Sequence, residues 1–238
     1  MPSGGAARDA TDSYQEFRHP LLALALTTGI AGAMDAFAFL RYGAFVANQS
    51  GNAIFLGLGP AGEHPAWPAS AAALVAFGAG AGIASWLRGQ RRGRAATWVN
   101  LVITEAALVL WAVLNVLLAY GRHHASFRIV LAASGALAMG ALATLLTSTA
   151  GFATTTTYQS GTVQKTGQYA VRWLTHPRAD RGRAELGILL GLLTIASYAA
   201  GGAVGAWVQR EPHWTPAWGA VALTAVALLV GRPSRTRS

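Results

Sequence analysis

The sequence predicts an all-α polytopic membrane protein with about six transmembrane helices, in two three-helix inverted repeats that each contain a short re-entrant or broken helix. Three observations lead to this fold class. Hydrophobic residues make up 53% of the chain and charged residues only 11%. Long apolar runs divide the chain, and a Gln-Ser-Gly tripeptide occurs once in each half.

The apolar runs predict the spans. A helix needs about 20 residues to cross a hydrocarbon core roughly 30 Å thick, and open strands would leave backbone groups unpaired in lipid. The predicted spans are Leu21–Leu40, Ala69–Leu87, Trp98–Ala119, Ile129–Phe152, Leu186–Val208 and Trp214–Val230. We therefore expect one transmembrane domain over residues 20–231, with a first repeat at about 20–120 and a second at about 127–231.

The basic residues predict the orientation. With a cytoplasmic N-terminus, 14 of the Lys and Arg residues fall inside and four outside, as the positive-inside rule requires. Residues 1–19 and the basic residues 232–238 are then cytoplasmic tails of a multi-pass protein. The sequence pI near 11 thus indicates contact with anionic lipid headgroups of the bilayer, not binding of nucleic acid.

The first polar interruption lies in the stretch VANQSGNAIFLGLGP, which begins at Val46. The chain from Gly43 to Ser50 is expected to be irregular, with a sharp turn at Gly51. Asn52–Leu58 is then a helix too short to span the membrane. Irregular backbone at membrane depth is tolerated where protein or a water-filled cavity surrounds it, so we expect a re-entrant half-helix.

The second polar interruption repeats the tripeptide in the other half, at Gln159, Ser160 and Gly161. It leads into Thr162–Leu174, an amphipathic pattern with Val163 on its apolar side. This helix either enters the membrane or lies along the cytoplasmic interface. Farther along, GAGAGIASW at residues 78–86 resembles AAGGAVGAW at 199–207, which supports a repeat. Because each repeat has three helices, an odd number, the second repeat would enter the membrane from the opposite face.

Two half-helices that meet from opposite faces would bring polar groups together near the midplane. Amides and hydroxyls both donate and accept hydrogen bonds, so they do not fix the charge of a solute. The candidate substrate-binding residues are Asp35, Asn48, Gln49, Ser50, Gly51, Asn52, Gln159, Ser160, Gly161, Thr162, Gln164 and Lys165.

Two carboxylates lie within predicted spans, where ionised Asp costs about 2.5 to 3.5 kcal/mol on insertion scales. Asp35 is either a proton or cation site, or a carboxylate satisfied by helix-end donors or by Arg41. Glu105 is expected to snorkel toward the cytoplasmic face, near Arg94. Lys165 is the only lysine; it either pairs with Asp35 or adds one more inside charge.

Other chemistry is not indicated. The chain has no cysteine, which excludes disulfides and thiolate metal sites. The adjacent His123 and His124 are expected to be solvated loop residues, and no other histidines have ligand spacing. No nucleophile elbow, phosphate-binding loop or dinucleotide fingerprint is present. We therefore expect neither an enzyme nor a bound cofactor or metal.

Residues 29–59, GIAGAMDAFAFLRYGAFVANQSGNAIFLGLG, resemble the signature of the YoaK-like family of bacterial inner-membrane proteins, a domain of unknown function. The matching positions are Gly32, Asp35, Ala36, Phe39 and Leu40, then Phe45, Val46, Asn48, Ser50, Gly51 and Asn52. Serine stands at position 50 where the family more often has threonine. The resemblance implies a polytopic membrane protein and supplies no substrate.

These observations favour a transporter or permease for an unidentified small solute, with a site between the two Gln-Ser-Gly elements. The alternative is a non-catalytic membrane scaffold that binds a protein or lipid partner through its glycine-rich helix faces. A hydrated cavity from Asp35 to both motifs would favour transport, and a dry core with an exposed apolar stripe would favour the scaffold. Homo-oligomerisation stays open.

Overall fold

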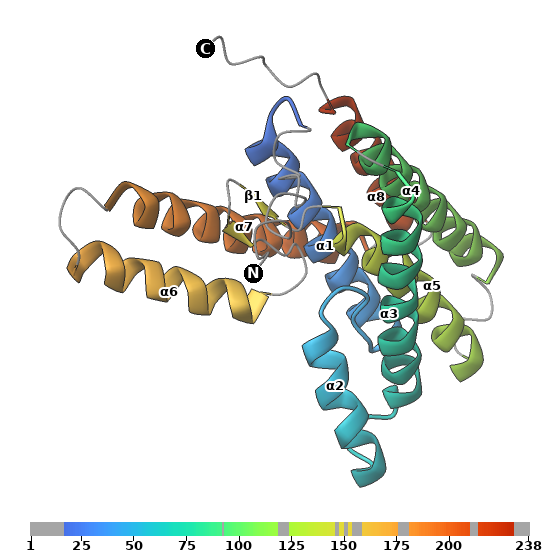
Figure 1. Ribbon diagram of the computed structural model, residues 1–238. Coiled ribbons are helices and arrows are strands. Elements are labelled where there is room, and N and C mark those ends of the chain that lie inside the picture. Colours follow the sequence, from blue (N-terminus) through green and yellow to red (C-terminus); the bar gives the residue numbers. More distant parts are fainter. Residues whose placement is uncertain are drawn as a thin grey trace, which may run out of the picture.

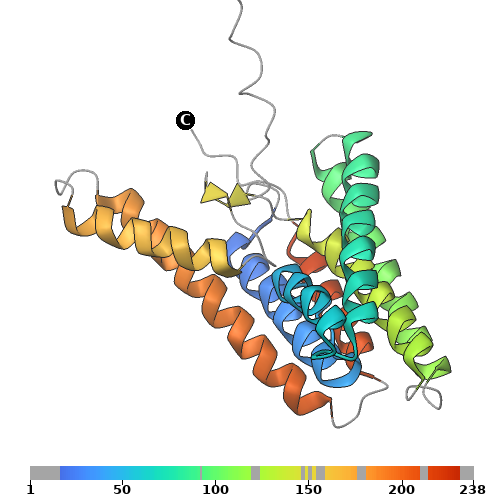
Figure 2. The same ribbon diagram turned by 90° about the horizontal axis from the view of Figure 1, so that it is seen from below.

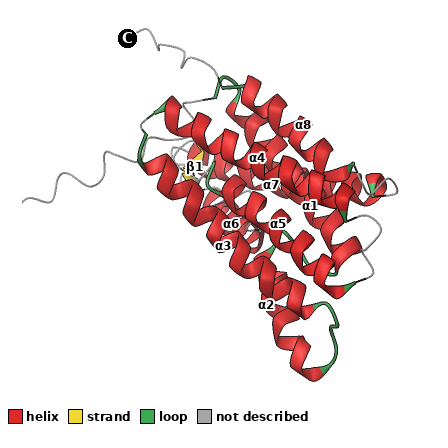
Figure 3. Ribbon diagram, turned by 90° about the vertical axis from the view of Figure 1, so that its right-hand side faces the viewer, coloured by secondary structure: helices red, strands yellow, loops and turns green. Residues whose placement is uncertain are grey.

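The computed structural model of the chain describes residues 17–91, 93–118, 124–145, 148–149, 152–153, 159–175, 181–209 and 214–230. Helices dominate this part of the chain (Figure 1, Figure 3). In chain order the elements are α1 (Pro20–Tyr42), α2 (Gln49–Leu58), the 3-10 turn η2 (Gly59–Ala61), α3 (Trp67–Gly89), α4 (Arg94–Leu117), α5 (Ala125–Ala143), β1 (Ser148–Thr149), β2 (Phe152–Ala153), α6 (Gln159–Thr175), α7 (Arg181–Val208) and α8 (Thr215–Leu228).

Five of the described helices, α1, α3, α4, α5 and α7, are long and apolar enough to cross a membrane. The helix α8 is also apolar but has only 14 residues. Proline lies in the first turn of α1, α3 and α8, where its missing N–H interrupts no intrahelical bond. An all-α protein with several membrane-spanning helices is confirmed.

The fourth predicted span, Ile129–Phe152, extends too far. The helix α5 ends at Ala143, and β1 and β2 follow it as a short antiparallel pair. Thr144 caps the helix, and its hydroxyl donates to the Ala141 carbonyl at 2.8 Å. The following sequence is rich in Ser and Thr, which compete for backbone hydrogen bonds and favour turns and strands. Apolar length alone therefore overestimated this helix.

Two closely packed helix pairs form the centre, α1 with α7 and α3 with α5. Glycines allow the close approach: a Cβ at Gly32 would collide with the carbonyl of Tyr198 in α7. In the second pair, a Cβ at Gly140 would collide with the carbonyl of Phe77. The same relation holds between Gly201 and Gly29, between Gly205 and Ala33, and between Gly80 and Leu137.

The other helices pack around these pairs. The helix α4 lies against α5 and α8, and α1 also contacts α8. The short helices each lie along one long helix, α2 along α3 and α6 along α7. Figures 1 and 2 both show α6 and the first part of α7 projecting from the rest of the bundle as a hairpin, whereas the later part of α7 packs on α1. The largest buried rings, Phe37, Tyr42 and Trp111, meet edge to face where α1 passes α4.

The two described ends of the chain lie together. Phe17 pairs with Val230 as an isolated β-bridge, and the N–H of Arg18 donates to the carbonyl of Leu229 at 2.7 Å. The segment before α1 and the segment after α8 are therefore on one side of the bundle.

Candidate functional site

The chain folds back into the bundle after α1. Gly43 ends the helix in the left-handed conformation, with φ 73°, which glycine adopts without strain. The N–H groups of Val46 and Ala47 then donate to Oδ1 of Asp35 at 2.8 and 2.6 Å, and that of Asn48 donates to Oδ2 at 2.8 Å. Asp35 lies two helical turns before the end of α1, so the loop runs back along α1 by roughly 10 Å.

The helix α2 starts at this depth and leads outward again. Its first residue, Gln49, follows the loop that binds Asp35, and the segment after α2 reaches the end of α1, where Nε2–H of His64 donates to the Gly43 carbonyl at 2.8 Å. Residues 43–58 thus enter and leave on the same side, and we call them the fold-back segment. The predicted irregular stretch is shorter than expected, since α2 begins at Gln49 and not at Asn52.

The polar side chains of the first motif hold the fold-back segment together. Asn52 is buried; its Nδ2 donates to the Phe45 carbonyl at 2.7 Å, and its Oδ1 accepts from the Phe45 N–H at 2.9 Å. Gln49 donates to the carbonyl of Val46 at 3.0 Å and accepts from Asn52 at 2.9 Å. Asn48 caps α2 by accepting from the Gly51 N–H at 3.3 Å. Ser50 is exposed.

Gly51 does not make the predicted sharp turn. It lies inside α2, where a Cβ would come within 2.6 Å of the Phe45 ring. Phe45 stacks on Phe39 at 4.8 Å and on Phe55 at 5.7 Å between ring centroids, and Phe55 stacks on His64 at 4.1 Å. The glycine therefore makes room for an aromatic stack, which links the fold-back segment to α1.

Asp35 also joins α1 to α7, because the hydroxyl of Tyr198 donates to its Oδ2. The carboxylate is 2% exposed and has four hydrogen bonds. Of the two structural partners predicted for Asp35, the helix-end donors are therefore found in part: the Asn48 N–H is at the N-cap of α2, and the Val46 and Ala47 N–H groups precede it. Arg41 is wrong, because its guanidinium donates to the carbonyl of Gln209.

The second motif also lies at the start of a short helix. Gln159 is the first residue of α6, as Gln49 is of α2. The helix α6 runs antiparallel to α7, with Tyr169 against Gly187 and Thr166 against Gly191. This register brings the start of α6 to the turn of α7 that carries Tyr198.

The remaining candidate residues of this motif differ in exposure. Gly161 is buried and Thr162 is half-buried, whereas Ser160, Gln164 and Lys165 are exposed.

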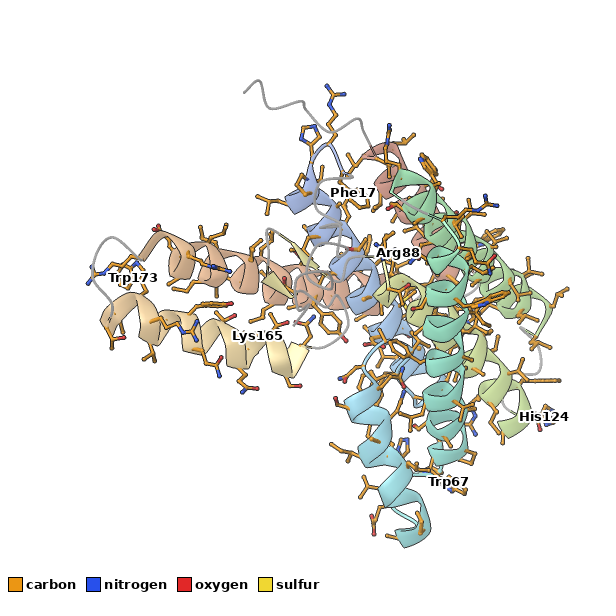
Figure 4. All side chains as sticks on the ribbon, in the orientation of Figure 1. Phe17, Trp67, Arg88, His124, Lys165 and Trp173 are labelled. Carbon is orange, nitrogen blue, oxygen red and sulfur yellow. The ribbon has the colours of Figure 1, made fainter. Side chains whose placement is uncertain are left out.

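The structure does not bring Lys165 to Asp35. Lys165 lies on α6 (Figure 4) and is exposed, whereas the carboxylate of Asp35 is enclosed by its four donors. The predicted pair is therefore wrong in this conformation.

Glu105 faces a groove between α4 and α8. Oε1 of Glu105 accepts from the hydroxyl of Thr224 at 3.2 Å, and the groove has a volume of about 380 Å³. A second, apolar groove of about 400 Å³ lies between α1, α7 and α8 and is lined by Met34, Gly201 and Trp218 among others. Neither groove is lined by Asp35 or by a residue of the two motifs.

Tyr198 is the site residue that sequence reasoning missed. A hydroxyl near the centre of an apolar span was the available signal, because such groups usually have a partner inside the protein. The backbone donors at 46–48 could not be inferred, since their orientation depends on the return of the chain beside α1.

The helices and the fold-back segment define a multi-pass helical membrane protein with a buried carboxylate at the junction of α1, α2 and α7. Residues 22–230 match the model of a family described as "Protein of unknown function (DUF1275)", and the chain belongs to that family. No curated protein and no solved structure matches. The narrower YoaK-like resemblance stays a prediction.

Proposed function

We propose that this protein is a transporter or permease for a small solute, and not an enzyme, with its site at Asp35 between the two Gln-Ser-Gly elements. One observation carries the proposal. A buried carboxylate inside a membrane-spanning helix binds the backbone N–H groups that precede a short, fold-back helix. Broken helices and intramembrane carboxylates are features that secondary transporters use to bind solutes and coupling ions.

We also infer an inverted repeat, which supports this proposal. Gly29 and Gly32 in α1 precede Leu137 and Gly140 in α5 by the same number of residues. Phe77 and Gly80 in α3 likewise precede Tyr198 and Gly201 in α7 by one constant number of residues. With these two offsets in residue number, the contacts Gly32–Tyr198 and Gly201–Gly29 between α1 and α7 correspond to Gly140–Phe77 and Gly80–Leu137 between α5 and α3. The same exchange relates α2 on α3 to α6 on α7, and α1 on α8 to α5 on α4. Such an arrangement surrounds a central site in inverted-repeat transporters.

The membrane orientation is part of the proposal. The positive-inside bias puts both termini in the cytoplasm of a bacterial inner membrane, with anionic headgroups beside the basic segments. The helix α6 fits that surface: Val163 and Leu174 are exposed on one side, and Lys165 and Arg172 on the other. Both alternatives for α6, a re-entrant and an interfacial position, are compatible with its packing on α7.

The occupied N–H groups favour one class of solute. Anions commonly bind at helix N-termini, but here Asp35 already accepts the hydrogen bonds of Val46, Ala47 and Asn48. An anionic solute would have to displace this carboxylate and would be repelled by it. A cation or a neutral solute rich in donors can instead replace one donor, such as Tyr198, and bind Asp35 directly.

Reconstitution in liposomes tests the proposal. Purified protein would be assayed electrically across a panel of ions, organic acids and amines, beside Asp35→Asn and the control Glu105→Gln. We expect flux of an amine or another cation that Asp35→Asn abolishes and Glu105→Gln preserves. Because Asp35→Asn can weaken folding, Tyr198→Phe is a second variant that keeps the carboxylate. Undiminished flux in Asp35→Asn would remove Asp35 from the mechanism.

A scaffold that binds a lipid or protein partner is the second candidate. The apolar groove between α1, α7 and α8, about 400 Å³ in volume, and the exposed apolar side of α6 favour it. Protein in lipid nanodiscs would then retain a lipid or a second copy in native mass spectrometry. It would also conduct no solute of the panel.

A further inference from the structure

The helix α4 turns a line of polar side chains into the protein interior. Thr97, Asn100, Thr104, Trp111 and Asn115 are each at most 1% exposed, and they follow one another at spacings of three, four or seven residues. Such spacing puts them on one face of a helix. We propose that this face of α4 lines the route by which the solute crosses the membrane, with Leu108 as its barrier. This inference rests on the proposed transport function.

One end of the line is a hydrogen-bonded cluster. Nδ2 of Asn100 donates to the hydroxyl of Thr144 at 2.6 Å, and the hydroxyl of Thr104 donates to Oδ1 of Asn100 at 3.2 Å. Nη1 of Arg88, at the end of α3, donates to the Thr144 carbonyl at 2.6 Å. The hydrogen bond from Arg88 places this end of the line at the side of the bundle where α3 ends and α4 begins.

The other end of the line reaches the neighbourhood of Asp35. The hydroxyl of Tyr42 donates to Oδ1 of Asn115 at 2.5 Å, and Nδ2 of Asn115 donates to the Trp111 carbonyl at 2.9 Å. A Cβ at Gly135 would touch both Trp111 and Val46, so these two side chains are neighbours. The N–H of Val46 is one of the donors to Asp35.

Two polar atoms of the line lack protein partners. Within the described residues, neither the hydroxyl of Thr97 nor the indole N–H of Trp111 forms a hydrogen bond, and both residues are buried. Buried polar groups are nearly always partnered, and in a membrane lipid supplies no partner. Polar residues that only join helices would be paired with each other. Water or a polar solute along this face would satisfy both atoms.

Leu108 interrupts the line between Thr104 and Trp111. Its side chain is fully buried, and its Cδ2 lies 3.7 Å from where a Cβ on Gly219 in α8 would be. Apolar constrictions close pores by excluding water. The contact of α4 with α8 at this level is therefore the barrier of the route in this conformation.

Cysteine scanning tests the route, since the chain contains no cysteine of its own. Thr97→Cys and Thr104→Cys introduce single thiols on the line, and Val102→Cys and Val109→Cys introduce matched thiols on the outer face of α4, where the valines are 61% and 47% exposed. Gln90→Cys, exposed between α3 and α4, is the positive control. The probe is a small charged methanethiosulfonate, applied to each protein in liposomes.

Only a hydrated thiol forms the reactive thiolate, so we expect the line to react at least about tenfold faster than the outer face. We also expect Leu108→Ala to increase solute flux, and modification of Thr104→Cys to block it. The route would be overturned if Thr97→Cys and Thr104→Cys were as unreactive as the two valine positions while Gln90→Cys was modified. If the wild type still conducts solute, that result leaves transport intact. Reactive cysteines on the line without any flux would instead overturn transport, and the route with it.

Discussion

The hydroxyl of Tyr198 in α7 donates a hydrogen bond to the carboxylate of Asp35 in α1, and this contact ties the fold-back segment to both halves of the chain. On the other side of the bundle, Gly140 approaches Phe77 as Gly32 approaches Tyr198, but Phe77 has no hydroxyl. The hydrogen bond from Tyr198 to Asp35 therefore has no counterpart at Phe77.

Tyr198→Phe removes this hydrogen bond and keeps the ring. We expect the free energy of unfolding in mixed micelles to fall by about 0.5–3 kcal/mol, which spans hydrogen bonds between membrane helices and hydrogen bonds to charged groups. A double-mutant cycle with Asp35→Asn isolates the pair, because the second change should cost less once the first is made. Strictly additive losses would contradict a direct contact.

Asp35→Asn should release the fold-back segment. The amide keeps one oxygen for Val46 and Ala47, but its nitrogen cannot accept from Asn48 or from Tyr198. We expect faster hydrogen exchange at the N–H groups of residues 46–48, measured by mass spectrometry in micelles.

Glu105→Gln serves as the matched control for Asp35→Asn, because Glu105 contacts Thr224 and not the fold-back segment. It should leave exchange at residues 46–48 unchanged. Equal exchange in Asp35→Asn and in the wild type would mean that the carboxylate does not hold the loop.

Asn52→Leu tests the structural role of the first motif. Leucine has a similar size but cannot bond the N–H and carbonyl of Phe45, so two partly buried backbone groups lose their partner. A loss of about 1–3 kcal/mol in stability is expected for each unsatisfied group. Ser50→Ala, two residues earlier and exposed, should stay within about 0.5 kcal/mol of the wild type. Thermal unfolding followed by circular dichroism compares the two, and similar melting temperatures would argue against this role.

Apolar run length was enough to predict the all-α class and most helix bounds, because a long apolar run has few stable alternatives in lipid. It failed at α5, where Thr144 and the following hydroxyl residues end the helix early. The starts of α2 and α6 at Gln49 and Gln159 agree with the repeated tripeptide. Contacts between distant segments were less predictable. The sequence left two structural alternatives for the partner of Asp35, helix-end donors and Arg41, and Tyr198 was overlooked.

Glycine substitutions test the close packing of the two helix pairs. A Cβ at Gly32 or Gly140 would meet a backbone carbonyl, which cannot rotate away as a side chain can. We expect Gly32→Ala and Gly140→Ala each to destabilise the protein by about 1–3 kcal/mol, the usual cost of overpacking. Similar losses at both positions are expected, because each glycine faces the same kind of backbone contact in its own pair.

Gly78→Ala and Gly82→Ala are the controls for this experiment, since both glycines lie in α3 with nothing within 4 Å of an added Cβ. Alanine restricts the unfolded chain and favours helix, so these variants should be neutral or more stable by about 0.5–1 kcal/mol. Unfolding in mixed micelles measures all four variants under one condition. If Gly32→Ala and Gly140→Ala behave like the controls, the helix pairs are not held at backbone contact, and the equivalence of α1 with α5 loses its main structural support.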